Sequence, residues 1–280
     1  MNESFIRVLT APNENKKKKK KTKKFLASFR SSRVKWMNPR ASTNEAYVPT
    51  YIEHVANVIT HGIWVVPSLL GGLELVKRSL TWTQLVSAWV YGTSLLLVFA
   101  VSTFFHSVHY CNHTQLKDVL HRCDRAMIYV FIAATYFPWL MVEDFPDNKW
   151  LSLMRYIVWI MATLGILYQQ VFHERYKMLE TIFYLVMGIG PSIAVISVNK
   201  FDNIGELKTG GLIYIVGLVF FKSDGRIPCA HAIWHLFVAG GAGLHYYAIL
   251  RHLYPSSMEQ IDGSLGGPAL TDILGSHVEL

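Results

Sequence analysis

The feature that most constrains this chain is a series of long, uncharged, apolar runs. Residues 84–109 contain no Lys, Arg, Asp or Glu, and the same holds for residues 54–73 and 156–172. A helix that crosses the roughly 30 Å hydrocarbon core of a bilayer needs about 20 predominantly apolar residues. Since 51% of the 280 residues are hydrophobic, the chain is predicted to be an all-α polytopic membrane protein.

Seven such runs can be recognised along the chain. They are residues 54–73, 84–109, 126–142, 156–172, 181–199, 209–221 and 230–250. The sixth is the shortest, because its uncharged stretch reaches only about 20 Å as a helix. Lys208 and Lys222 bound it, and their long side chains can reach opposite interfaces, so a tilted or thinned crossing still fits. The sequence therefore predicts a seven-transmembrane-helix bundle.

The formal charge of +8 comes from the segment before the first run. Residues 1–50 hold 13 Lys and Arg against 3 Glu, and Lys16–Lys21 is an unbroken block. Such a segment cannot bury itself, so the leader 1–50 is expected to be disordered. Nucleic acid and anionic lipid both attract lysines, and lipid contributes about 1 kcal/mol per basic residue near the surface. Because apolar runs follow at once, we expect Lys16–Lys24 to lie on anionic lipid, with no nucleic-acid partner.

The leader also predicts the orientation and the domain organisation. Basic residues next to a first span stay in the cytosol, which gives a cytosolic N-terminus. The transmembrane domain is predicted over residues 51–254, followed by a flexible tail over 255–280. Three cysteines are too few and too scattered for a disulfide framework.

Several polar side chains interrupt the apolar runs at equivalent depths. Ser102 and His106 end the second run, Asp124 lies at the start of the third, and His231 and His235 start the seventh. With seven crossings, these three ends lie on the same face of the membrane, whichever way the protein is oriented. Ionisable groups at such depth are functional candidates by default.

Their chemistry is that of a metal site. Residues four apart share one helix face, and three histidines with an open fourth position are typical of catalytic zinc. Zinc lowers the pKa of its bound water to about 7, so Asp124 is the candidate base, with Ser102 holding the water or a ligand. His231 and His235 are spaced as in H-E-x-x-H helices but lack the glutamate. The alternative is that these groups are hydrogen-bonding contacts between helices; for the whole set, metal is favoured.

A second polar series lies in the first run. Glu53, Asn57 and His61 follow each other one turn apart, and we expect them to pack as structural polar groups against the floor of the site. His121, at the edge of a predicted cytosolic loop, is expected to be solvated.

Together these positions resemble a known family. Glu53-x-x-x-Asn57-x-x-x-His61, Ser102-x-x-x-His106, Asp124 and His231-x-x-x-His235 resemble the progestin and adipoQ receptor (PAQR) family and its haemolysin III relatives. The resemblance covers residues 45–254. Residues 121–140, 211–239 and 245–254 look like the family's monocyte-to-macrophage differentiation branch.

The resemblance implies a seven-helix bundle with zinc near the cytosolic leaflet. It implies zinc ligands at His106, His231 and His235, with Ser102 and Asp124 linked to the zinc through water. The branch implies a signalling receptor or scaffold in the Golgi or another endomembrane, favoured over the plasma membrane, with signalling proteins at its cytosolic face. The superfamily also includes alkaline ceramidases, so a zinc-dependent lipid amide hydrolase is the alternative, with an acyl ligand in the bundle cavity. A pore has little support, because no repeated polar stripe lines the runs.

Overall fold

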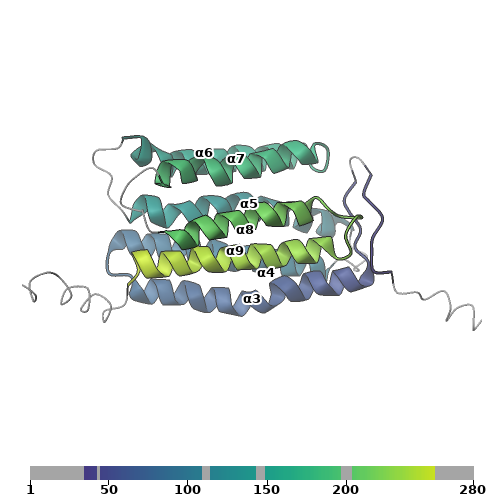
Figure 1. Ribbon diagram of the computed structural model, residues 1–280, viewed down its shortest axis with the longest axis horizontal. Helices are drawn as coiled ribbons and strands as arrows, with labels where there is room; N and C mark the ends of the chain where they lie inside the picture. Colours follow the sequence, from purple (N-terminus) through teal and green to yellow (C-terminus); the bar gives the residue numbers. More distant parts are fainter. Residues whose placement is uncertain (1–34, 43–44, 109–113, 143–148, 197–203, 256–280) are drawn as a thin grey trace, which may run out of the picture. The chain divides into compact units, whose positions relative to one another are not determined.

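The protein is a bundle of α-helices. A computed structural model describes residues 35–42, 45–108, 114–142, 149–196 and 204–255. These residues contain seven helices and no strand (Figure 1). The helices are α3 (Tyr51–Arg78), α4 (Trp82–Ser107), α5 (Thr114–Met141), α6 (Lys149–Val171), α7 (Lys177–Ile196), α8 (Gly205–Phe221) and α9 (Ala230–Leu253). Each corresponds to one predicted span, so the predicted all-α seven-helix fold is confirmed.

The helices extend beyond the apolar runs that predicted them. The short sixth span lies in α8, which begins at Gly205 and has 17 residues, about 25 Å of helix. Helix α5 begins at Thr114, well before the predicted start at residue 126, so it carries Asp124 inside its regular part. Among the described helices, α3, α4 and α9 are each long and apolar enough to cross a membrane unaided.

Local sequence explains where the first two helices begin. The Thr50 hydroxyl accepts a hydrogen bond from the backbone N–H of Glu53 at the start of α3. Thr81 and Gln84 form a reciprocal capping box at the start of α4. Such caps satisfy N–H groups that the first helical turn leaves unpaired.

Most helices pack on a neighbour in the chain, and α5 also contacts α7 and α9. Helix α3 packs on α4, α4 on α5, and α8 on α9, while α9 also contacts α3 and α5. Helices α6 and α7 lie beside α5 (Figure 1). A Cβ atom on Gly92 would lie only 2.8 Å from the Cα of Gly72, so glycines allow the close approach of α3 and α4.

Large apolar side chains cover the outside of the bundle. On α3, for example, Ile63, Val66 and Leu70 are each more than half exposed. In water this would be a costly surface, whereas in a bilayer it is the surface that lipid covers.

The described part of residues 37–50 belongs to the same compact unit as the helices. The lysine-rich segment Lys16–Lys24 and residues 256–280 of the tail lie outside the described residues.

Candidate metal centre

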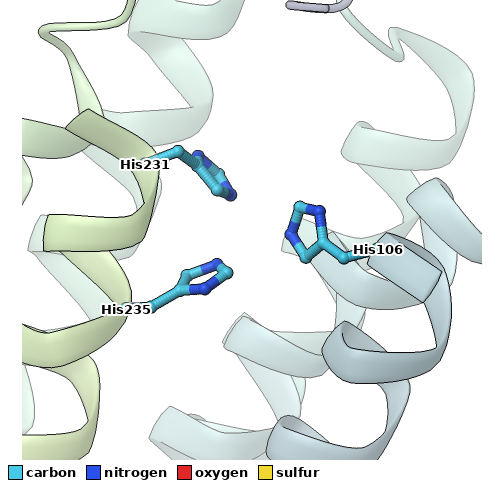
Figure 2. Close-up of side chains that lie close together, drawn as sticks. All are labelled: His106, His231 and His235. Carbon is cyan, nitrogen blue, oxygen red and sulfur yellow. The ribbon is translucent and has the colours of Figure 1, made fainter. Parts of the chain in front are cut away.

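Three histidines from two helices converge at one end of the bundle. His106 lies in the last turn of α4, and His231 and His235 lie in the first two turns of α9. One nitrogen from each ring lies within 4.8 Å of the other two, and Figure 2 shows the rings facing a common point. The ring centroids are 4.7–5.3 Å apart. The structure thus brings together the three residues that the sequence predicted as metal ligands.

The hydrogen bonding of His235 fixes which nitrogen faces this point. Its Nδ1 lies 3.1 Å from the Thr60 hydroxyl, and that hydroxyl donates its only proton to the carbonyl of Ala56, 2.8 Å away. Thr60 must therefore accept the bond from Nδ1–H of His235. In that tautomer Nε2 keeps its lone pair, which is the state that a metal ligand requires.

His106 also has a contact on α3, the helix that carries Thr60. The amide of Asn57 lies 3.5 Å from Nδ1 of His106 and 2.7 Å from the hydroxyl of Tyr47. The amide nitrogen of Asn57 donates to the Tyr47 hydroxyl, and this bond holds the amide beside Nδ1 of His106. His106 is 1% exposed and His235 2% exposed, so both rings are held away from bulk water.

The third histidine is held through its backbone. Helix α9 begins after Cys229, which offers no side-chain cap. Instead, the Glu53 carboxylate on α3 accepts a hydrogen bond from the backbone N–H of His231 at 3.4 Å. Glu53 is fully buried, and a carboxylate at a helix N-terminus is stabilised by the helix dipole. Among the described residues, Nδ1 of His231 has no hydrogen-bond partner.

One face of α3 therefore supports the whole cluster. Glu53, Asn57 and Thr60 contact His231, His106 and His235 respectively, and the ring of His61 stacks on that of His235 at 3.7 Å. The predicted polar residues Glu53, Asn57 and His61 all lie here, whereas the sequence reasoning missed Thr60. Thr60 follows Asn57 by three residues and Glu53 by seven. This spacing places it on the same helix face and could have indicated its role.

Ser102 and Asp124 lie beside the histidines. Both residues line a cavity of about 900 Å³ together with His106, His231 and His235. Ser102 is 2% exposed. All five residues of the predicted site thus border one cavity.

A second polar cluster lies where α6 turns into α7. Glu174 forms ion pairs with Arg125 at 2.9 Å and Lys177 at 2.7 Å, and His121 lies 3.6 Å from the same carboxylate. The expectation that His121 is solvated was wrong, because its side chain is only 16% exposed.

His121, His173 and Glu174 have ligand atoms close enough for a metal. However, two cations already neutralise the carboxylate, and burial together with neighbouring arginines lowers the pKa of His173. We therefore interpret the cluster as an ion-pair network that joins α5 to the α6–α7 turn. The network depends on the backbone of Glu174, which has a positive φ of 63°. No sequence pattern predicted this conformation.

The histidine cluster fits a zinc ion. Neutral imidazoles are preferred zinc ligands at about 2.0–2.1 Å, so two nitrogens on one ion are at most about 4.2 Å apart. The ring nitrogens lie within 4.8 Å of one another, so the rings would have to move closer together to share one ion. Three imidazole nitrogens with a carboxylate nearby match the donor set of zinc sites that keep one open position, and two of the rings contact side chains of α3 through Nδ1.

Comparison with known proteins places the chain in a family. The model of the family described as haemolysin-III related matches residues 50–246. The chain is 46% identical over 236 residues to the monocyte to macrophage differentiation factor of Rattus norvegicus, covering 83% of this chain and 98% of that protein. The human protein of the same name is 46% identical over 231 residues, covering 81% and 96%.

A bacterial relative matches over nearly its whole length. Hemolysin-3 of Bacillus cereus is 32% identical over 214 residues, covering 73% of this chain and 94% of that protein. The matched region begins at the N-cap of α3 and ends within α9, so it contains every residue of the histidine cluster and its α3 support. The chain therefore belongs to the haemolysin-III related (PAQR) family of multipass membrane proteins.

Proposed function

We propose that the chain is a membrane signalling receptor or scaffold that binds zinc through His106, His231 and His235 and a lipid in the adjoining cavity. The observation that carries the zinc proposal is the bond between Thr60 and His235. When His235 donates from Nδ1 to Thr60, its Nε2 keeps the lone pair that a metal ligand requires. One nitrogen of each of the three rings lies within 4.8 Å of the other two.

The lipid proposal is supported by a second cavity that adjoins the first. Its volume is about 410 Å³, and it is lined almost entirely by apolar side chains of α5, α7 and α8. Ile128, Phe221 and Trp234 border both cavities. An acyl chain suits the apolar cavity, with its polar end beside Asp124 and the histidines.

The cellular setting follows from the resemblance to the monocyte-to-macrophage differentiation branch. We expect the protein in the Golgi or another endomembrane, with signalling proteins at the cytosolic face and anionic lipid bound through Lys16–Lys24. A tagged full-length chain found only at the plasma membrane would contradict the endomembrane proposal. Equal binding of wild-type protein and a Lys16–Lys24 alanine variant to anionic vesicles would contradict the lipid contact of the leader.

Metal analysis of the purified protein tests the zinc proposal. Wild-type protein is expected to retain about one zinc per chain, and the double variant His231→Ala, His235→Ala is expected to lose it. His252→Ala, near the other end of α9, is the matched control and should retain the metal. Equal zinc in the wild type and the double variant would refute the site.

The second candidate function is a zinc-dependent lipid amide hydrolase. The position of Ser102 and Asp124 in the lining of the cavity that also contains the three histidines favours it. Bound zinc would supply a Lewis acid that polarises a carbonyl and activates water. Asp124 would accept the proton of that water as general base, and Ser102 would orient the Asp124 carboxylate.

Fatty-acid release separates the two functions. A hydrolase is expected to release fatty acid from a panel of ceramides, and Asp124→Asn should abolish release while zinc content is kept. A receptor or scaffold would bind lipid without releasing fatty acid, and its signalling would persist in Asp124→Asn.

A further inference from the structure

The segment before α3 lies against the metal centre. We call the described residues 37–42 and 45–50 the strap. The strap is anchored at two loops: the backbone of Arg40 packs on Gly225 in the α8–α9 turn, and the carbonyl of Glu45 accepts a hydrogen bond from Lys177 in the α6–α7 region. Gly225 has a φ of +72°, and a Cβ there would lie 2.5 Å from the Arg40 backbone. Only glycine permits this approach without strain.

Seven residues of the strap line the cavity that contains the histidines. They are Arg40, Ala41, Ser42, Ala46, Tyr47, Val48 and Pro49. The strap therefore forms part of the wall between the metal centre and the predicted cytosolic side.

Tyr47 is the strap residue that reaches the histidines. Its ring lies over that of His231, with centroids 5.0 Å apart and planes inclined by 30°. Its hydroxyl lies 2.7 Å from the Asn57 amide, which in turn contacts Nδ1 of His106. The next residue, Val48, is 62% exposed. The more polar of the two side chains is thus the one turned inward, which hydrophobicity alone does not explain.

These contacts connect Tyr47 to two of the three candidate ligands. The ring limits the orientations open to His231, whose Nδ1 has no hydrogen-bond partner among the described residues. The hydroxyl accepts a hydrogen bond from the Asn57 amide nitrogen and so holds the amide that contacts Nδ1 of His106. Groups that orient a ligating histidine in this way typically change metal affinity 10–100-fold when removed.

We propose that Tyr47 is a positioning residue of the metal centre, so that the strap completes a site that the helices alone leave loose and open. This inference rests on the zinc proposal made above. Helices α4 and α9 carry the three histidines, and side chains of α3 contact each of these histidines. The strap contacts His231 and the Asn57 amide from the predicted cytosolic side. Release of the strap would loosen two ligands and open the cavity together.

Cobalt binding to full-length protein in detergent tests the proposal. Metal-free protein is loaded with Co²⁺, and the visible ligand-field spectrum and the rate of cobalt loss to excess chelator are recorded. Tyr47→Phe keeps the ring over His231 and removes the hydroxyl, whereas Tyr47→Ala removes both. We expect cobalt loss to be faster by about 10–100-fold in Tyr47→Ala, with an altered spectrum, and by an intermediate factor in Tyr47→Phe. Glu45→Gln, on the same strap, should match the wild type, because this exposed side chain does not line the cavity and the backbone carbonyl is kept.

A metal-independent arm measures access to the cavity. In chelator-treated protein with Cys111, Cys123 and Cys229 changed to Ser, a Ser102→Cys substitution reports the labelling rate with a small charged thiol reagent. Tyr47→Ala and Gly225→Ala are each expected to accelerate labelling, because both weaken the seating of the strap. Glu45→Gln should leave the labelling rate unchanged.

The two arms separate this proposal from the zinc proposal. Failure of wild-type protein to bind Co²⁺ would refute the metal centre, while labelling rates would still test the strap. Normal Co²⁺ binding with the same spectrum and loss rate in Tyr47→Phe and Tyr47→Ala would overturn the positioning role. If Tyr47→Ala does not fold, Tyr47→Phe carries the test, because it retains the packing.

Discussion

At the scale of single residues, Thr60 illustrates how a side chain outside the histidine cluster can prepare a candidate metal ligand. Its hydroxyl proton goes to the Ala56 carbonyl, so its oxygen is left to accept from His235. When His235 donates from Nδ1, its other ring nitrogen is the one left without a proton. Asn57 also contacts Nδ1 of His106, but there the amide nitrogen faces the ring.

Thr60→Val should therefore weaken metal binding without unfolding the protein. Valine keeps the shape of threonine but cannot accept from Nδ1–H of His235, so we expect zinc affinity to fall about 10–100-fold. Thr60→Ser, which keeps the hydroxyl, should remain close to wild type. Chelator competition measures the affinity. Thr163→Val, which removes a hydroxyl that bonds only its own helix, is the control, and an equal effect in both variants would contradict the role of Thr60.

Asp224 gives the protein a predicted pH dependence. It lies in the turn between α8 and α9, and burial, reinforced by the nearby Glu53 carboxylate, raises its pKa to about 7, although Arg125, Lys177 and Lys222 oppose the shift. The folded protein therefore holds a proton that the unfolded chain releases near pH 4. Stability from this group is present below about pH 4 and is lost as the pH rises to about 7.

Asp224→Asn should flatten this dependence. The amide cannot ionise, so the fall in melting temperature between pH 5 and pH 8 is expected to be smaller in the variant than in the wild type. Thermal denaturation in detergent at the two pH values measures the difference. Asp118→Asn, at an exposed carboxylate on α5, should leave the wild-type dependence unchanged. A dependence in Asp224→Asn as steep as that of the wild type would exclude Asp224 as its source.

At the scale of elements, α3 organises the centre although it supplies no ligand. It contacts α4 and α9, the two helices that carry the histidines, and its polar face meets both of them. The Glu53 carboxylate supplies the N-terminal cap that α9 lacks. The spacing between α3 and α4 therefore bears on the geometry of the site.

Gly92→Ala tests the packing of α3 on α4. The added methyl group would lie 2.8 Å from the Gly72 backbone, so the helices must separate, at a cost of about 1–3 kcal/mol. We expect a clearly lower melting temperature. Gly243→Ala, where a Cβ meets no atom within 4 Å, is the matched control. Equal melting temperatures in the two variants would show that the close approach is not required.

At the scale of the whole molecule, the four helices α5 to α8 between the end of α4 and the start of α9 determine which side chains meet, because an even number of crossings returns the chain to the same side. The ends of α4, α5 and α9 that carry His106, Asp124 and His231 fall on one side of the bundle. The strap, which leads directly into α3, lies on the same side. The metal centre, the cavity and the strap are therefore on the side predicted to face the cytosol.

This orientation predicts that Asn112 carries no glycan. Asn112-His113-Thr114 matches the acceptor sequence for N-glycosylation. It lies in a segment predicted to be cytosolic, where the glycosylation machinery does not reach it. Glycosidase treatment of protein expressed in animal cells should leave its electrophoretic mobility unchanged. An acceptor sequence engineered into the tail after residue 255 is the control and should be glycosylated. A glycan on Asn112 would contradict the predicted orientation, because it would show that this segment does not face the cytosol.

The sequence by itself determined the helix count and the residues that meet at one end of the bundle. The lengths of the apolar runs and the spacing of His106, His231 and His235 sufficed for this, because a helix must cross the whole bilayer. The number of crossings between two helix ends then decides whether they lie on the same face of the membrane. Glu53, Asn57 and His61 could be read from the same periodicity.

The tertiary structure alone decided which side chains support these histidines and which cover them. The pairing of Thr60 with His235 depends on how α3 meets α9, and the position of Glu174 depends on a turn with positive φ. Tyr47 lies in a segment without periodicity, and its contact with His231 depends on Gly225, 178 positions later in the chain. Such contacts arise between parts far apart in sequence, and a local pattern contains no information about them.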